Sequence, residues 1–332
     1  DYGIYQPDGS HYAYRTLLFL GIDPNVAAER VVDWYQIKGF KNNVFETSFL
    51  TSNHSETWGL VAPRILYSML SVPFVFLFGL SGMLVIPCIS FVVLIICVFR
   101  MSELYRKPKI GMLLVIFLCT SPTILRWMIA NITDSLLTGL FGIVAFILMS
   151  NLSKEKWSLF VYTLVFLTSI TRFCTLIWIA IAVVQWSESK HKRSLGILVV
   201  SIISSIPILY YMPSNAVLPE NAGSSGISKL LVLIESFFKV GFFEIAQLAV
   251  LDRVLLIVIV LATAIAFRYP KDLPSKYFLL VFLAVWSTGA INGTVGVNFR
   301  YQLPVVAFAC WRILSVSNDS FDWFGRRRFN IE

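Results

Sequence analysis

From about residue 83 onward, long apolar runs alternate with short polar connections. An apolar stretch of ~20 residues can cross a bilayer as a helix, whereas membrane barrels show alternating segments of ~10 residues. The pattern therefore predicts an all-α integral membrane protein with about nine transmembrane helices. The predicted spans cover residues 83–99, 110–125, 133–150, 157–170, 172–187, 195–211, 252–267, 277–291 and 301–315.

The first 78 residues have a different pattern. Amphipathic helices are predicted at about 10–20 and from Asp23 to about Tyr35, where Asp23 is a good N-cap and is followed by Pro24 at the first helical position. Residues 61–78 are apolar but contain two prolines and an arginine, and they end at Gly79-Leu80-Ser81-Gly82, which predicts a break. We expect residues 1–78 to form an outer-face loop with juxtamembrane helices, and the sequence leaves open one more span before Asp1.

Composition agrees with a membrane protein. Hydrophobic residues make up 57% of the 332-residue chain and charged residues only 14%, against ~25% charged in soluble domains. The net charge of +8 has a topological explanation, because Lys and Arg mark cytoplasmic connections. Fifteen of the 27 basic residues fall in alternate connections and in the C-terminal tail, residues 317–332. That tail is therefore predicted to be cytoplasmic, and nucleic acid is not expected as a partner.

The segment 227–250 tests this orientation. It is apolar enough to be a span but carries four charged residues. If it crossed the membrane, the basic connection 268–276 and the tail would both lie outside, against the positive-inside rule. We therefore interpret it as an amphipathic helix on the outer interface, within an outer loop at 212–251 of a transmembrane bundle at 79–316.

A small set of charged residues remains on the predicted outer face. Ionisable groups beside the apolar slab are costly unless they are paired or hydrated, so they are candidates for function. Guanidinium groups bind phosphate well, and a carboxylate can act as a general base or metal ligand. Asp8 is the candidate catalytic carboxylate, and the candidate substrate-binding residues are Arg15, Arg126, Asp134, Arg172, Arg300 and Tyr301.

Structural explanations stand beside these functional ones. Arg126 lies about two helical turns before Asp134, so the two could form a simple ion pair. The arginines could extend toward lipid headgroups, and Asp8 could serve a turn in Pro7-Asp8-Gly9. The five cysteines and three histidines lack metal-ligand spacing, so we expect no metal site built from them, and the identity of any cofactor, including a divalent metal, stays open.

The order of these features resembles the GT-C superfamily of polytopic membrane glycosyltransferases, which use polyprenyl-phosphate-linked sugars. Asp8 is followed by Tyr12 in the first outer loop, Ser121-Pro122 precedes a span that starts Thr133-Asp134, and Arg300-Tyr301-Gln302-Leu303-Pro304 opens the last span. The resemblance covers most of the chain loosely. One departure is that many family members carry an acidic pair in the first loop, whereas here Asp8 is followed by Gly9.

The resemblance implies transfer of a sugar from a polyprenyl-phosphate donor to an acceptor on the periplasmic or luminal face of a cell envelope or organelle membrane. Asp8 would then be the base or metal-binding carboxylate, and Arg300 a contact to the lipid phosphate. The expected partners are membrane lipids and that donor. Two alternatives remain: a non-catalytic GT-C-like subunit packed with protein partners in a larger complex, and a lipid or solute transporter.

Overall fold

The computed structural model describes residues 7–39, 47–51, 63–150, 158–188, 190–211, 226–291 and 300–316. All elements in this part of the chain are helices, which confirms the all-α prediction. The predicted cytoplasmic tail at 317–332 lies outside the described residues, as does the loop before residue 226.

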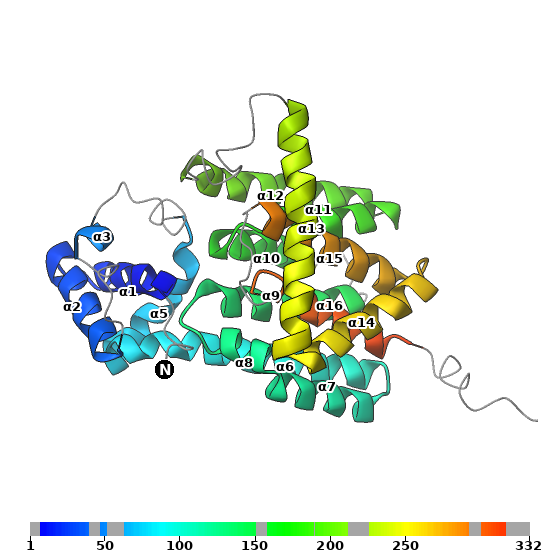
Figure 1. Ribbon diagram of the computed structural model, residues 1–332, viewed down its shortest axis with the longest axis horizontal. Helices are drawn as coiled ribbons and strands as arrows, with labels where there is room; N and C mark the ends of the chain where they lie inside the picture. The colour runs from blue at the N-terminus through cyan, green and yellow to red at the C-terminus, as the bar shows by residue number, and fades with distance from the viewer. Residues whose placement is uncertain are drawn as a thin grey trace, which may run out of the picture.

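Helices α1 (Pro7–Phe19), α2 (Pro24–Ile37), α3 (Thr47–Thr51) and α5 (Ile65–Phe78) gather at one end of the molecule (Figure 1). The expected cap of α2 forms, since Asp23 accepts a hydrogen bond from the backbone N–H of Asn25 at 2.9 Å. The core of this group contains three fully buried tyrosines, Tyr12, Tyr35 and Tyr67.

The break after α5 is a turn built from the 3₁₀-helix η1 (Gly79–Leu84). Gly79 has a φ of 62°, a conformation that glycine adopts without strain. The Tyr67 hydroxyl donates to the backbone carbonyl of Met83 at 2.8 Å. In a straight helix two residues 16 apart would be separated by about 24 Å, so the chain folds back on itself here.

The remaining helices form a bundle, which α13 crosses steeply (Figure 1). Helices lie at the predicted spans with bounds that agree to within a few residues, except that the segment 110–125 is divided between two helices bent by 69°, and α13 covers the segment that was not predicted to be a span. The helices are α6 (Val85–Leu104), α7 (Pro108–Thr120), α8 (Pro122–Met128), α9 (Thr133–Met149), α10 (Ser158–Thr171), α11 (Thr175–Ser187), α12 (His191–Tyr211), α13 (Gly226–Leu251), α14 (Arg253–Arg268), α15 (Leu273–Ile291) and α16 (Val305–Leu314).

Small residues bring these helices into close contact. A Cβ atom added at Gly139 of α9 would lie 2.8 Å from the carbonyl oxygen of Ser90 on α6. One at Gly111 of α7 would lie 2.0 Å from the hydroxyl of Ser102 on α6. Close backbone approach through Gly and Ser is the usual packing device of helices in lipid.

The basic connections meet at the end of the bundle away from α1 and α2 (Figure 1). Lys276 pairs with Glu188 at 2.8 Å, and the Lys107 ammonium donates to the carbonyl oxygen of Val316. Arg312 approaches Asp272 at 3.6 Å. These contacts join connections that the charge pattern assigned to one side.

Many outward helix faces are apolar. On α6 the exposed side chains include Ile89, Val92 and Ile96, spaced three and four residues apart along one face. By length and composition, one described helical run passes as a membrane span, Ile65–Leu104, although the turn at η1 divides it. The pair α7 and α8, bent by 69°, passes when taken as one span, and several shorter apolar helices do not reach the length required.

Candidate functional site

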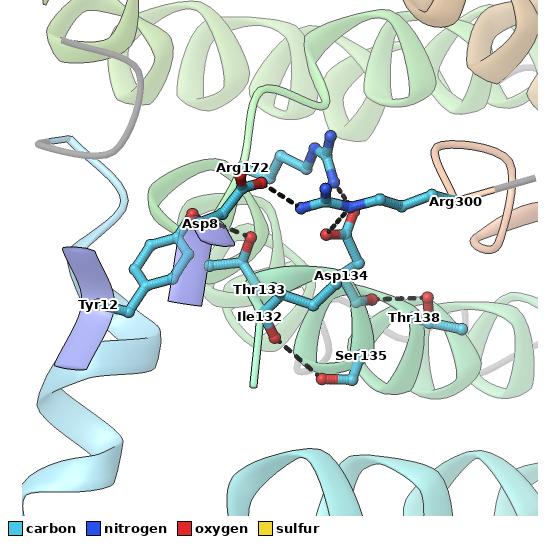
Figure 2. Close-up of polar contacts among 9 residues, drawn as sticks. All are labelled: Asp8, Tyr12, Ile132, Thr133, Asp134, Ser135, Thr138, Arg172 and Arg300. Atoms are coloured by element: carbon cyan, nitrogen blue, oxygen red, sulfur yellow. Dashed lines mark hydrogen bonds and ion pairs between the residues drawn. The ribbon is translucent and has the colours of Figure 1, made fainter. Parts of the chain in front are cut away.

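The centre of the site is Asp134, in the first turn of α9. Its carboxylate is almost completely buried, with 2% of the side chain exposed, and it forms ion pairs with two arginines. Arg172, in the connection between α10 and α11, pairs with Oδ1. Arg300, shortly before α16, donates through Nε to Oδ2 at 2.9 Å (Figure 2).

Arg300 also reaches a second carboxylate. Its Nη2 atom donates to Oδ2 of Asp8 at 2.7 Å. Asp8 lies in the first turn of α1, where the helix dipole favours a negative charge. Its side chain is 39% exposed, so of the two carboxylates Asp8 is the one that a substrate can reach.

The start of α1 is held against the bundle by polar contacts. The Tyr12 hydroxyl lies 3.4 Å from Oγ1 of Thr133, the residue before Asp134 (Figure 2). Asn131 donates to the Tyr35 hydroxyl at 2.7 Å. A Cβ atom at Gly9 would lie 2.3 Å from the Asn131 amide, so there is no room for a side chain at this position.

Aromatic rings complete the surroundings of the arginines. The guanidinium of Arg172 lies over the Tyr301 ring at 4.0 Å from its centroid. Arg300 lies 5.4 Å from the Trp127 ring centroid. Cation–π contacts of this kind hold guanidinium groups in place and do not use their N–H donors.

The arginines control the acid–base behaviour of the site. Burial would raise the pKa of Asp8, but the charge and hydrogen bond of Arg300, with smaller effects of Arg64 and Arg172, lower it below the ordinary value. Burial also opposes ionisation of Tyr301, yet Arg172, Arg300 and Arg64 together lower the pKa of its hydroxyl. Asp8 is therefore a carboxylate at neutral pH.

The structure brings five of the seven sequence-predicted residues together: Asp8, Asp134, Arg172, Arg300 and Tyr301. Asp134 pairs with Arg172 and Arg300, and no described ion pair joins it to Arg126. Arg126 lies over its neighbour Trp127 at 5.0 Å, and Arg15 lies over Phe19 at 5.8 Å. Neither of these two takes part in the described ion-pair network.

One residue of the site was missed. Arg64 precedes α5 and lies close enough to affect the pKa of both Asp8 and Tyr301. The signal that singled out the other arginines applies to it as well, because it is a basic residue on the predicted outer face at the edge of an apolar segment. The neighbouring prolines, Pro63 and Pro73, predict a helix break at this segment and give no indication of a site.

The described residues contain no group of three or more His, Cys, Asp or Glu side chains that could hold a metal ion. The two carboxylates of the site are both engaged by Arg300, which lies between them. This donor set does not fit a divalent cation in the present arrangement. Comparisons with family models, curated proteins and solved structures found no match to the chain.

Proposed function

We propose that the chain is a multi-pass membrane protein whose α1–α5 end lies on the outer face and whose basic connections are cytoplasmic. The apolar outward faces of α6, α12 and α14 support a lipid environment, because a water-soluble bundle would present polar side chains there. The clustering of basic connections at the opposite end supports the orientation. In this proposal the nine predicted spans correspond to α6, α7 with α8, α9 to α12, and α14 to α16.

We further propose that the protein transfers a sugar from a polyprenyl-phosphate donor to an acceptor on the outer face. The observation that carries this proposal is the ion-pair network of Asp8, Asp134, Arg172 and Arg300, which joins four distant segments at the outer end of the bundle. It places a reachable carboxylate within hydrogen-bond distance of a guanidinium, as acid–base chemistry beside a phosphate leaving group requires.

In the proposed reaction the acceptor hydroxyl attacks the anomeric carbon of the donor sugar. The bond from that carbon to the phosphate oxygen breaks, and the lipid phosphate leaves with the electron pair. Asp8 takes the proton of the acceptor hydroxyl. The arginines stabilise the negative charge that develops on the phosphate. Asp134 keeps Arg172 and Arg300 in position, which makes it a positioning residue.

A specific observation supports the alternative of a non-catalytic subunit. Asp8 is ion-paired and its pKa is lowered, which makes it a weaker base than a free carboxylate. A network whose carboxylates are both neutralised is also what a purely structural site would contain. The two proposals differ in whether Asp8 is needed for more than folding.

Label transfer from a polyprenyl-phosphate sugar by the purified protein in lipid nanodiscs tests this. We expect Asp8→Asn to lower kcat by about 10²–10⁴-fold, the usual contribution of a general base, while the protein stays folded. Arg30→Gln, at an exposed position on α2, is the matched control. Equal transfer by wild type and Asp8→Asn would exclude Asp8 as the base, and no transfer by wild type would favour the subunit alternative.

A further inference from the structure

The charges of the site do not cancel. Three guanidinium groups, of Arg64, Arg172 and Arg300, face two carboxylates, of Asp8 and Asp134. His11, one turn after Asp8 on α1, does not change this count, because burial lowers its pKa to about 4 and it is neutral at physiological pH. The site as described therefore holds one more positive than negative charge.

The unbalanced charge belongs to Arg64. Arg300 uses Nε and Nη2 on the two carboxylates, and Arg172 is paired with Asp134. No described ion pair involves Arg64, and its Nε atom is buried without a hydrogen-bond partner. Its side chain is otherwise half-buried, so it can reach a ligand from the site.

Helix packing directs Arg64 toward the site. The Ser68 hydroxyl of α5 donates to the carbonyl oxygen of Tyr12 on α1 at 3.1 Å. One helical turn before these two residues are Arg64 and Asp8, and the effect of Arg64 on the Asp8 carboxyl agrees with their proximity. Tyr12 in turn touches Thr133, the neighbour of Asp134.

We propose that Arg64 is the principal phosphate-binding residue of this site, taking an anionic phosphate group with the remaining donors of Arg172 and Arg300. A buried guanidinium nitrogen without a partner gains a charge-assisted hydrogen bond when a phosphate oxygen arrives, whereas Arg300 would have to give up one it already makes. This changes the assignment implied by the family resemblance, in which Arg300 was the contact to the lipid phosphate. The Arg64 proposal rests on the proposed function only for the identity of the molecule that carries the phosphate, the polyprenyl lipid.

Equilibrium binding to the full chain in zwitterionic nanodiscs tests the proposal with three probes: a sugar-free polyprenyl phosphate, phosphatidic acid and inorganic phosphate. We expect Arg64→Gln to weaken polyprenyl-phosphate binding by about tenfold or more, and Arg64→Lys to recover part of it, since lysine keeps the charge but loses the planar fork of donors. Arg30→Gln should bind as wild type does. Melting temperatures of all variants separate lost binding from lost folding.

The three probes identify the carrier. If inorganic phosphate binds and its binding depends on Arg64, the free anion is sufficient for recognition. If only the binding of the two lipids depends on Arg64, the site recognises a lipid phosphate. A folded Arg64→Gln protein that binds all probes as wild type does overturns the proposal, and so does wild type that binds none of them. Sugar transfer measured on the same samples is a separate readout. If Arg64→Gln binds phosphate and transfers sugar as wild type does, the Arg64 proposal fails but the proposed function stands. If phosphate binding depends on Arg64 but neither wild type nor any variant transfers sugar, the proposed function fails and only the phosphate site remains.

Discussion

Asp134 illustrates what single residues contribute to this site. Its buried carboxylate holds two guanidinium groups that come from 38 and 166 residues further along the chain. Removing one member of a buried ion network leaves the others charged without a partner, which costs more than the pair itself contributes.

We therefore predict that Asp134→Asn destabilises the protein by about 3–5 kcal/mol, or prevents folding, because Arg172 and Arg300 lose their shared anion. Thermal unfolding in nanodiscs measures this. Thr138→Ala is the local control, since Thr138 donates only to the Asp134 backbone carbonyl at 2.7 Å and its loss should cost less than about 1 kcal/mol. A comparable loss in both variants would contradict the central role of the carboxylate.

The ion pair of Asp8 with Arg300 predicts a pH dependence. The pKa of Asp8 is lower in the folded protein than its ordinary value of 3.8, so the pair stabilises the fold above that pH and the contribution disappears as pH falls through the lowered pKa. Because Asp8 is partly exposed and solvent screens the pair, we expect only about 0.5 kcal/mol. Melting temperatures of wild type and Asp8→Asn should converge as the pH falls below 3.8, and a difference that stays constant as the pH falls would show that the pair contributes nothing.

The sequence identified the members of this site better than their pairing. Outer-face arginines and Asp8 were recognisable because charges there oppose the positive-inside bias. The pairing of guanidinium groups with carboxylates could not be predicted. Distance along the sequence favoured Arg126 as the partner of Asp134, whereas helix packing brings Arg172 and Arg300 to it.

Helix positions were predictable because long apolar runs and the Asp23-Pro24 cap are local signals. Contacts between helix ends are not local. Asp252 caps α14 by accepting from the Leu255 backbone N–H at 2.9 Å, and the same carboxylate accepts from the Thr123 backbone N–H at 3.0 Å and from the Ser121 hydroxyl at the start of α8. The only role predicted for Asp252 is to begin a span.

One buried carboxylate thus caps two helices from different parts of the chain. We predict that Asp252→Ala destabilises the protein by about 2–3 kcal/mol, since a cap contributes about 1 kcal/mol and the buried donors of α8 lose their acceptor. Asp23→Ala on the exposed cap of α2 should cost only about 1 kcal/mol. Chemical or thermal unfolding of both variants checks the ratio, and equal losses would mean that the link between α8 and α14 carries no stability.

Across the whole molecule, an apolar groove of about 660 Å³ runs between α13, α14 and α15. It lies close to the site, because Gly289 of α15 packs against Val240 of α13 and against Gln302, two residues after Arg300. α13 crosses its neighbours steeply (Figure 1), and the side chains that line the groove are almost all apolar. Under the proposed function, it is where the hydrocarbon chain of the donor can lie.

We predict that Ala264→Trp, which fills part of this groove from α14, raises KM for a long-chain polyprenyl-phosphate donor by about tenfold. Displacing about two CH₂ groups from the groove costs ~1.6 kcal/mol, and 1.4 kcal/mol corresponds to a factor of ten. A short-chain donor should be affected much less, because it leaves the far part of the groove empty. Ile257→Trp, at an exposed position of α14 outside the groove, is the control. If KM changes equally for both donors, or equally in both variants, the donor chain does not lie in this groove. The donor would then have to reach the phosphate-binding arginines from another side of the bundle.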